Sequence, residues 1–199
     1  MLFGLLGLKR SGKSTVANYL VNNHGFVEKS FADPLKKACK ELFLLEDEQL
    51  YGTQEDKETP DNRWFGCTPR QMMQFVGTDL LRKQLNVIMP GIHQNLFTYH
   101  FQLWIKHNPN LNVVISDVRF QNEVDFIHSL GGKIIKLQRD ENINYDDLHE
   151  SEKNQELIKN YDSFIVNNDT MKELFDNISF IVNNDTMNEL FDNISSLIK

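Results

Sequence analysis

The stretch that decides the fold of this chain is Gly7-Leu8-Lys9-Arg10-Ser11-Gly12-Lys13-Ser14. It has the pattern G-x-x-x-x-G-K-[ST]. It stands between a short apolar run at 2–6, typical of a buried parallel strand, and a segment at 14–22 with the apolar spacing of a helix. In that setting the pattern predicts a phosphate-binding loop, because its glycines let backbone N–H groups curl around an anion at the positive end of the helix.

The loop supplies the first candidate binding residues. We expect Lys13 to bridge the β- and γ-phosphates of ATP, and the hydroxyl of Ser14 to bind Mg²⁺. The predicted cofactors are therefore ATP and Mg²⁺. The residues expected to surround the nucleotide are Gly7, Lys9, Arg10, Ser11, Gly12, Lys13, Ser14 and Thr15.

Strand-like and helix-like segments alternate along the rest of the chain. Apolar runs predict further strands at 26–31, 112–116, 133–138 and 163–166, and helical spacing predicts helices at 34–45, 91–107, 121–130 and 170–178. Another helix begins at Thr68, the expected N-cap, with Pro69 in the first helical position. Residues 46–67 are polar and interrupted by glycine and proline, so we expect a loop-rich insert there. The alternation predicts an α/β fold with a parallel sheet covered by helices on both faces.

Composition excludes several classes of protein. The chain of 199 residues is 40% hydrophobic and 11% aromatic, which is enough to bury a core and rules out a disordered chain. Its net charge of −7 disfavours binding to polymeric nucleic acid. No run approaches the ~18 apolar residues that cross a membrane, and the apolar start lacks the features of a signal peptide. Since the two cysteines, Cys39 and Cys67, have no zinc-site spacing, we expect a cytoplasmic protein, in the host cytoplasm if the chain is viral.

A tandem repeat occupies the C-terminal part of the chain. Residues 163–178, SFIVNNDTMKELFDNI, recur at 179–194 with one difference, Lys172 against Asn188. Two such short copies do not make a solenoid. One copy would fill a sheet position, and the other would add an edge strand, pack outside or fray. A tolerated insertion near the terminus is the simpler interpretation, although an added edge strand could pair two chains and so leaves a homodimer open.

Further candidate residues lie where predicted strands end or helices begin. Asp117 ends a strand, where a second acid can hold Mg²⁺ through water, and Arg119 is two residues on, at the sheet edge where α/β folds bind ligands. Arg139 ends another strand, and it could clamp a phosphate at the start of a lid formed by the acidic segment that follows. Arg70 and Arg82 are basic residues that could bind a second anion.

Several of these residues belong to longer strings that resemble one family. After the loop the chain contains, in order, Ser30-Phe-Ala-Asp-Pro-Leu35, Thr68-Pro-Arg-Gln-Met-Met-Gln-Phe-Val-Gly-Thr-Asp79, Asp117-Val-Arg-Phe-Gln-Asn-Glu123 and His149-Glu-Ser-Glu152. Over roughly residues 1–165 the chain resembles the deoxynucleoside monophosphate kinases of phages and large DNA viruses. Residues 84–111 and the repeated tail match no part of that family's pattern.

The resemblance implies both a fold and an activity. The fold would be a P-loop NTPase-type three-layer sandwich with a five-stranded parallel sheet, a helical substrate-binding insert and a short lid. The activity would be phosphorylation of deoxynucleoside monophosphates (dNMPs) by ATP with Mg²⁺. The residues implied to contact the substrate are Asp33, Arg70, Gln74 and Arg119, to which the basic residue Arg82 is added.

We therefore expect a single kinase domain at 1–178, with the mostly helical insert at 46–111 and the lid at 140–152, followed by the duplicate and tail at 179–199. The expected catalytic residues are Lys13, Asp117 and Arg139, and the expected metal ligands are Ser14 and Asp117. The phosphoryl group would pass in line to the dNMP phosphate. Two alternatives stay open: another small-acceptor P-loop kinase similar to dephospho-CoA kinase, and a P-loop ATPase or regulatory module without a small-molecule acceptor.

Overall fold

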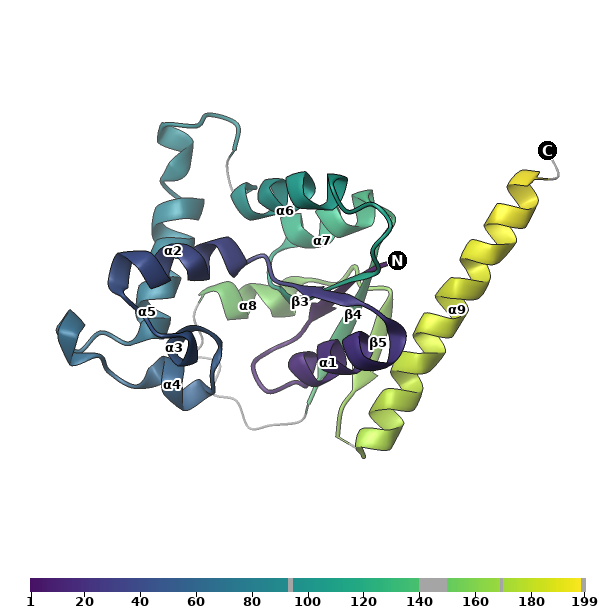
Figure 1. The fold of residues 1–199 in the computed structure, drawn as a ribbon, viewed down its shortest axis with the longest axis horizontal. Coiled ribbons are helices and arrows are strands. Elements are labelled where there is room, and N and C mark those ends of the chain that lie inside the picture. The colour runs from purple at the N-terminus through teal and green to yellow at the C-terminus, as the bar shows by residue number, and fades with distance from the viewer. Residues whose placement is uncertain (93–94, 140–149, 169, 198–199) are drawn as a thin grey trace. The chain divides into compact units, whose positions relative to one another are not determined.

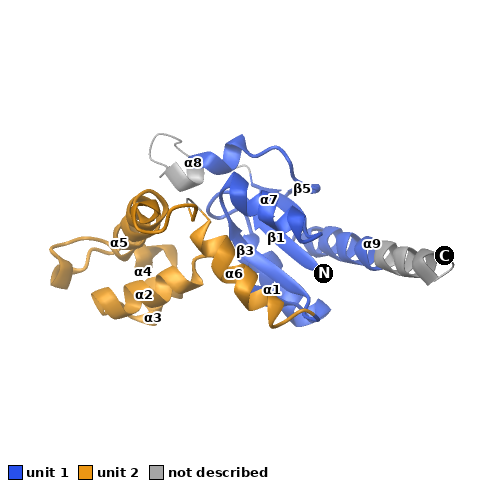
Figure 2. Ribbon diagram, turned by 90° about the horizontal axis from the view of Figure 1, so that it is seen from above, with its two compact units in different colours: residues 1–29, 110–199 blue, residues 30–109 orange. Residues whose placement is uncertain are grey.

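The computed structural model describes residues 1–92, 95–139, 150–168 and 170–197, which form two compact units (Figure 2). Unit 1 comprises residues 1–29 and 110–199, and unit 2 comprises residues 30–109. Each unit is described by itself below. Most of the lid predicted at 140–152 lies outside the described residues.

A five-stranded parallel sheet forms the centre of unit 1 (Figure 1). Its strands are β1 (Leu2–Leu6), β2 (Val27–Lys29), β3 (Val113–Val118), β4 (Lys133–Gln138) and β5 (Ser163–Val166), in the order β2-β3-β1-β4-β5. β1 is buried over its whole length, because a central strand of a parallel sheet is covered on both faces. The predicted α/β fold with a five-stranded parallel sheet is confirmed.

Helices cover both faces of this sheet. The helices of unit 1 are α1 (Lys13–His24), α7 (Gln121–Ser129), α8 (Glu150–Leu157) and α9 (Met171–Leu197). α1 and α9 lie on one face, where Leu20 and Ile178 share a core with Phe3 of β1. Gly4 follows Phe3 in β1 and therefore faces the opposite side of the sheet. A Cβ on Gly4 would come within 2.7 Å of Cδ1 of Ile127 in α7, so α7 covers that face. The three layers are therefore arranged as predicted.

Unit 2 is helical. Its elements are α2 (Asp33–Phe43), α3 (Asp47–Tyr51), α4 (Gln54–Glu58), the 3-10 helix η1 (Asn62–Trp64), α5 (Pro69–Gln74), the π-helix η2 (Phe75–Arg82), the 3-10 helix η3 (Leu85–Val87) and α6 (Leu96–Lys106). A small core joins α2, α3, α5 and η2 and consists of Cys39, Leu45, Leu50, Met72 and Val76. The predicted start of α5 is confirmed, because Thr68 Oγ1 accepts a hydrogen bond from the Gln71 N–H at 3.1 Å and Pro69 is the first helical residue.

Between α2 and α5 the structure differs from the prediction. The segment 46–67 was expected to be rich in loops, and it instead contains two five-residue helices, α3 and α4. Each begins with a reciprocal cap: Gln49 Oε1 accepts from the Glu46 N–H at 2.9 Å, and Thr53 Oγ1 accepts from the Asp56 N–H at 3.2 Å. The prediction was wrong because such caps stabilise helices that are too short for an apolar period to be recognised.

The two copies of the repeat form different structures. The first copy supplies β5 and the beginning of α9. The second copy, at 179–194, does not form an edge strand and instead continues α9 to a length of 27 residues. Within the described ranges, no helix combines the length and the apolar character needed to cross a membrane, α9 included.

Candidate active site

A loop built on two glycines joins β1 to α1, at the position that the sequence motif predicted. Gly7 has a φ of 150° and Gly12 a φ of 102°, conformations that favour glycine. A Cβ on Gly7 would collide with the carbonyl oxygen of Leu137, and a Cβ on Gly12 would collide with the side chain of Asn167. Because α1 begins at Lys13, the first N–H groups of that helix also lie at the loop. The loop therefore has the backbone that an anion-binding site needs.

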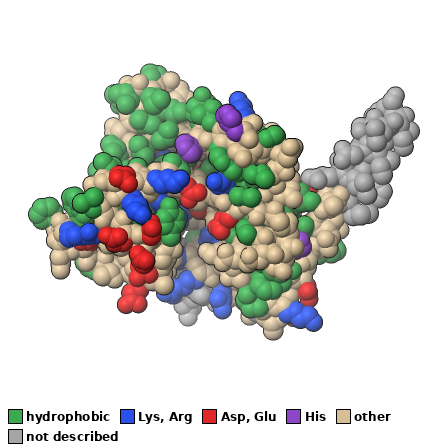
Figure 3. Space-filling model, viewed as in Figure 1, with side chains coloured by type: hydrophobic (Ala, Val, Ile, Leu, Met, Phe, Trp, Pro, Cys, Tyr) green, Lys and Arg blue, Asp and Glu red, His purple; other side chains and the backbone are tan. Residues whose placement is uncertain are grey.

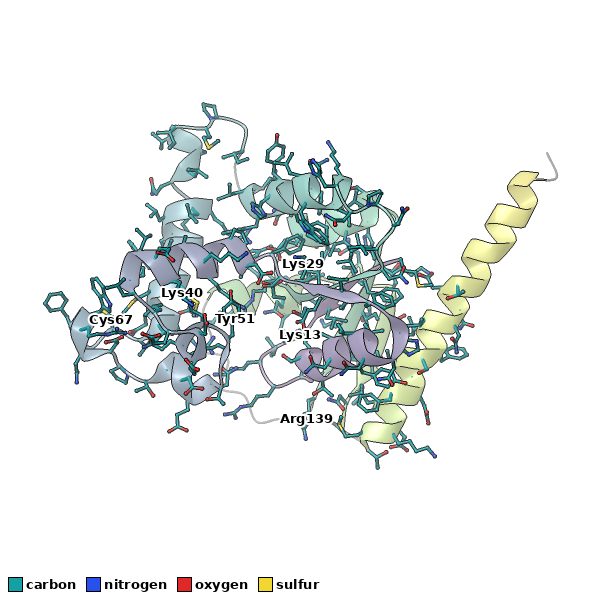
Figure 4. The ribbon with its side chains drawn as sticks, viewed as in Figure 1. Lys13, Lys29, Lys40, Tyr51, Cys67 and Arg139 are labelled. Carbon is teal, nitrogen blue, oxygen red and sulfur yellow. The ribbon has the colours of Figure 1, made fainter. Side chains whose placement is uncertain are left out.

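Lys13 folds back over this loop from the start of α1 (Figure 4). Its Nζ donates hydrogen bonds to the carbonyl oxygens of Gly7 at 2.5 Å and Leu8 at 2.7 Å. The ammonium group is thus held at the loop, where it can meet the phosphates of a nucleotide. Among the other predicted loop residues, Ser11 is buried, Lys9 and Thr15 are half-buried, and Arg10 and Ser14 are exposed.

Two further predicted residues reach the same edge of the sheet as the loop. β1 lies between β3 and β4, and its last residue, Leu6, pairs with Val118 and Lys136. Asp117 immediately precedes Val118, and Arg139 is the first residue after β4. Because the carboxyl ends of parallel strands meet at one edge of a sheet, the loop, Asp117 and Arg139 share that edge.

Arg119 follows β3, and its backbone is held by α7. Glu123 in the first turn of α7 is 1% exposed and accepts hydrogen bonds from the N–H groups of Arg119 at 2.7 Å and Phe120 at 3.2 Å. The string D-V-R-F-x-N-E therefore contains both the arginine and the glutamate that fixes the backbone of this arginine at the sheet edge.

Two oxygen donors at this edge fit Mg²⁺. Ser14 is an exposed residue in the first turn of α1, and Asp117 is the second-to-last residue of β3. Mg²⁺ takes oxygen ligands, keeps several waters and is usually held by one or two carboxylates together with substrate phosphates. A hydroxyl and a carboxylate beside a phosphate-binding loop are such a donor set.

Three of the predicted substrate residues of unit 2 mark the ends of its helices. Asp33 begins α2 and accepts a hydrogen bond from the Ser30 N–H at 3.3 Å. Gln74 ends α5. Arg82 ends η2, and its guanidinium carbon lies 5.0 Å from the centre of the Phe97 ring, within the range of a cation–π contact.

Tyr51, the last residue of α3, was not predicted as a site residue. Burial raises the pKa of Tyr51, and the negative charges of Asp33 and Asp47 raise it further. Lys36 Nζ lies 4.6 Å from the centre of its ring. Tyr51, labelled in Figure 4, therefore keeps its hydroxyl proton at neutral pH and offers unit 2 a hydrogen-bond donor.

The fourth predicted substrate residue, Arg70, is held by α4. Its guanidinium donates to Gln54 Oε1, and its Nε lies 3.2 Å from Glu58 Oε1, close enough for an ion pair although this N–H does not point at the carboxylate. Figure 3 shows acidic and basic side chains interleaved over the part of unit 2 formed by α2, α3 and α4. An anion that binds Arg70 would therefore compete with Glu58.

Two residues that the sequence did not single out contact the loop. Gln155 of α8 is 2% exposed, and its Oε1 accepts a hydrogen bond from the Gly7 N–H at 3.2 Å. Asn167, the residue after β5, donates from Nδ2 to the carbonyl oxygen of Ser11 at 3.1 Å. The position of Asn167 at the carboxyl end of a predicted strand was a usable signal, whereas Gln155 lies in a polar segment with no pattern to mark it.

Comparison with known proteins leads to one family. The sequence pattern of the family described as "Deoxynucleotide monophosphate kinase" matches residues 55–178. A protein of Acanthamoeba polyphaga mimivirus, named "Putative deoxynucleotide monophosphate kinase", is 62% identical over 182 residues, which cover 89% of this chain and 94% of the mimivirus protein.

Solved structures agree with the fold. Dephospho-CoA kinase from Campylobacter jejuni aligns with a TM-score of 0.52 at 15% identity, over 94% of this chain and 98% of that one. TT1252 from Thermus thermophilus aligns with a TM-score of 0.50 at 14% identity, over 92% and 97% of the two chains. At such identities the likeness concerns the fold alone. The family resemblance seen in the sequence is carried by the sequence matches and is confirmed: the chain belongs to the deoxynucleotide monophosphate kinase family, and is a nucleotide kinase.

Proposed function

We propose that this kinase transfers the γ-phosphoryl group of ATP to a dNMP, in line and with Mg²⁺, to give a deoxynucleoside diphosphate. The observation that carries the proposal is the loop between β1 and α1, with its two positive-φ glycines and with Lys13 folded over it, in a chain of the deoxynucleotide monophosphate kinase family. The strings around Arg70 and Asp117 support the choice of a monophosphate as the acceptor.

The chemistry needs little covalent help from the protein. The second pKa of a phosphate monoester is about 6, so the acceptor is mostly a dianion at pH 7 and attacks without a general base. The protein must bring two anions together and stabilise the charge on the transferred group. Lys13 and Arg139 would supply positive charge on the ATP side, and Arg70 and Arg119 would hold the acceptor phosphate. Ser14 would bind Mg²⁺ directly and Asp117 would hold it through water, and the ion would add further positive charge at the ATP phosphates.

Unit 2 supplies four of the five candidate substrate residues, Asp33, Arg70, Gln74 and Arg82. Arg70 has Glu58 and Gln54 as its present partners, and a dianionic phosphate can replace them because it accepts two charge-assisted hydrogen bonds from one guanidinium group. When no substrate is bound, Gln54 and Glu58 of α4 would hold the guanidinium group of Arg70.

The first experiment measures ADP release from Mg²⁺-ATP with a panel of dNMPs and NMPs. Turnover should depend on a dNMP and should fall about a hundredfold or more in Lys13→Ala. Lys37→Ala, which removes an exposed lysine of α2, is the matched control and should leave the rate unchanged. Turnover that is indifferent to every monophosphate would contradict the proposal and favour an ATPase module, and turnover with dephospho-CoA in place of a dNMP would favour the other small-acceptor kinase.

A second experiment separates the two substrates. Arg70→Ala should raise the KM for the dNMP about tenfold or more and leave the KM for ATP near its original value, because a charge-assisted hydrogen bond to the acceptor is lost. Equal increases in both KM values would remove Arg70 from the acceptor site.

A further inference from the structure

The phosphate-binding loop is held at both ends by amide side chains from the C-terminal part of unit 1. At its first residue, the Gly7 N–H donates to Gln155 Oε1 at 3.2 Å. Near its end, Asn167 Nδ2 donates to the Ser11 carbonyl oxygen at 3.1 Å. Both contacts join parts of the chain that are about 150 residues apart in sequence, so the loop is not shaped by its own glycines alone.

Asn167 is itself fixed by the sheet. It follows the last residue of β5, and its backbone N–H donates to the Gln138 carbonyl oxygen at 2.7 Å, which continues the β4–β5 ladder by one residue. The same Nδ2 atom also lies beside Gly12, because a Cβ on that residue would collide with it. The loop therefore rests on a side chain whose backbone cannot shift without breaking the sheet.

We propose that Asn167 is a positioning residue of the phosphate-binding loop, and that it sets the direction of the Gly12 N–H group to which a nucleotide phosphate binds. The peptide bond between Ser11 and Gly12 is planar and trans, so its C=O and N–H groups point in opposite directions. The hydrogen bond from Asn167 fixes the C=O, and it thereby turns the N–H to the side of the loop away from Asn167. Gly12 has a φ of 102° and no Cβ to restrict rotation about its N–Cα bond. The Ser11–Gly12 peptide therefore needs a contact from another part of the chain to hold it in one orientation.

The inference rests on the nucleotide site of the proposed function and on no property of the acceptor. Its readout is therefore ATP affinity, which is measured without a dNMP. If the chain binds ATP but turns over no dNMP, the proposed function fails and this inference is still tested. If ATP affinity ignores Asn167, the inference fails whatever the acceptor is.

The repeat provides a matched control inside the same chain. Asn183 is the counterpart of Asn167, with the same neighbours V-N-N-D-T, and it is an exposed residue of α9. Asn183→Ala removes the same atoms from the same local sequence and should leave ATP affinity unchanged.

The experiment compares ATP affinity and steady-state kinetics of the full chain with those of Asn167→Ala, Asn183→Ala, the double variant and Asn167→Asp. Asn167→Ala should weaken ATP binding about fivefold to tenfold, as expected for one lost hydrogen bond. It should raise the KM for ATP and leave the KM for the dNMP unchanged, a split that a general loss of folding would not produce. Asn167→Asp should bind ATP more weakly than Asn167→Ala, because its carboxylate would face a carbonyl oxygen and the ATP phosphates.

Asn167→Ala decides the outcome. If it binds ATP as tightly as the original chain, the proposal is wrong, whether or not the double variant loses affinity. The double variant should bind ATP no more weakly than Asn167→Ala, because the hydrogen bond to the Ser11 carbonyl oxygen comes from Asn167. Thermal unfolding identifies a variant that does not fold, in which case Asn167→Ser, which also lacks the amide, takes its place in the comparison.

Discussion

Residues 163–178 and residues 179–194 differ at one position, and the structure uses them in two ways. In the first copy, S-F-I-V is strand β5, whereas in the second copy the same four residues are part of helix α9. The burial pattern changes accordingly: Ile165 is buried and Val166 exposed in the first copy, but Val182, the counterpart of Val166, is buried in the second. The same local sequence thus has the alternating burial of a strand in the first copy and the burial pattern of a helix in the second.

The threonine of the repeat shows the same contrast. Thr170 is the N-cap of α9: its Oγ1 accepts from the Glu173 N–H at 3.3 Å, and Glu173 Oε2 accepts from the Thr170 N–H at 3.0 Å. Its counterpart Thr186 lies inside the helix and donates to the Val182 carbonyl oxygen at 3.0 Å. An N-cap threonine followed by a glutamate three residues later therefore begins a helix only where the preceding residues are not already helical.

The residue that precedes each copy explains which copy becomes the strand. Asp162 precedes the first copy, and its Oδ2 accepts from the Ile134 N–H at 2.7 Å and lies 2.9 Å from His128 Nε2, which ties it to β4 and α7. Ile178 precedes the second copy and is fully buried in α9. Adding residues to an existing helix needs no new nucleus, so the second copy continues the helix that the first copy began.

The largest expected effect comes from the isoleucine of the S-F-I-V segment in each copy, Ile165 and Ile181. Ile165→Ala should lower the free energy of unfolding by about 3 kcal/mol, because the side chain is 6% exposed in the core of unit 1. Ile181→Ala should lower it by about 1 kcal/mol, since Ile181 is only partly buried against that core. Urea denaturation measures both values, and equal losses would show that the two copies are not used differently.

The second-largest effect on the free energy of unfolding is expected at Asp162, the residue before the first copy. Asp162→Ala leaves the N–H of the buried Ile134 without its carboxylate partner, and it should lower the free energy of unfolding by about 1.5 kcal/mol. Asp162→Asn keeps an acceptor oxygen and should cost less than half as much. If the alanine variant unfolds at the same urea concentration as the original chain, Asp162 does not select the first copy.

The two threonines should respond with opposite signs. Thr170→Ala removes an N-cap and should lower the free energy of unfolding by about 1 kcal/mol. Thr186→Ala replaces threonine by the best helix former in a helix interior, and it should raise the free energy of unfolding by about 0.5 kcal/mol. The sign of each change, read from urea midpoints, checks the assignment. Losses of the same size would mean that Thr186 also caps a helix.

The smallest effect is expected from the position where the copies differ. Lys172→Asn makes the first copy identical to the second, and it should change the free energy of unfolding by less than about 0.5 kcal/mol because Lys172 is exposed. Circular dichroism should show the same helix content. A change in helix content would place the choice between strand and helix in this residue rather than in the flanking contacts.

The part of the candidate site made of one continuous segment could be predicted from the sequence. The glycine loop, Lys13 and Ser14 form a local motif, and the motif carries its own geometry because the strand before it and the helix after it are adjacent in sequence. Asp117, Arg119 and Arg139 could be predicted to lie near it for a related reason: each lies where a predicted parallel strand ends.

The contacts that hold this segment in place could not be predicted in the same way. Gln155 lies in a polar helix without an apolar period, and its hydrogen bond to Gly7 exists only because α8 is brought beside the loop. Arg70 was predicted as an anion-binding residue, but its ion-pair distance to Glu58 depends on α4, a helix that the sequence patterns did not reveal.

The sequence by itself determined the α/β class, the phosphate-binding loop and the family of this protein, because these depend on periodicity and on motifs formed by neighbouring residues. Only the tertiary structure decided which of two nearly identical segments is a strand and which asparagine reaches the loop. Local propensity is the same for both copies, so other contacts make the choice. The first copy pairs with β4, and the residue before it contacts α7, whereas the second copy follows a helix that has already begun.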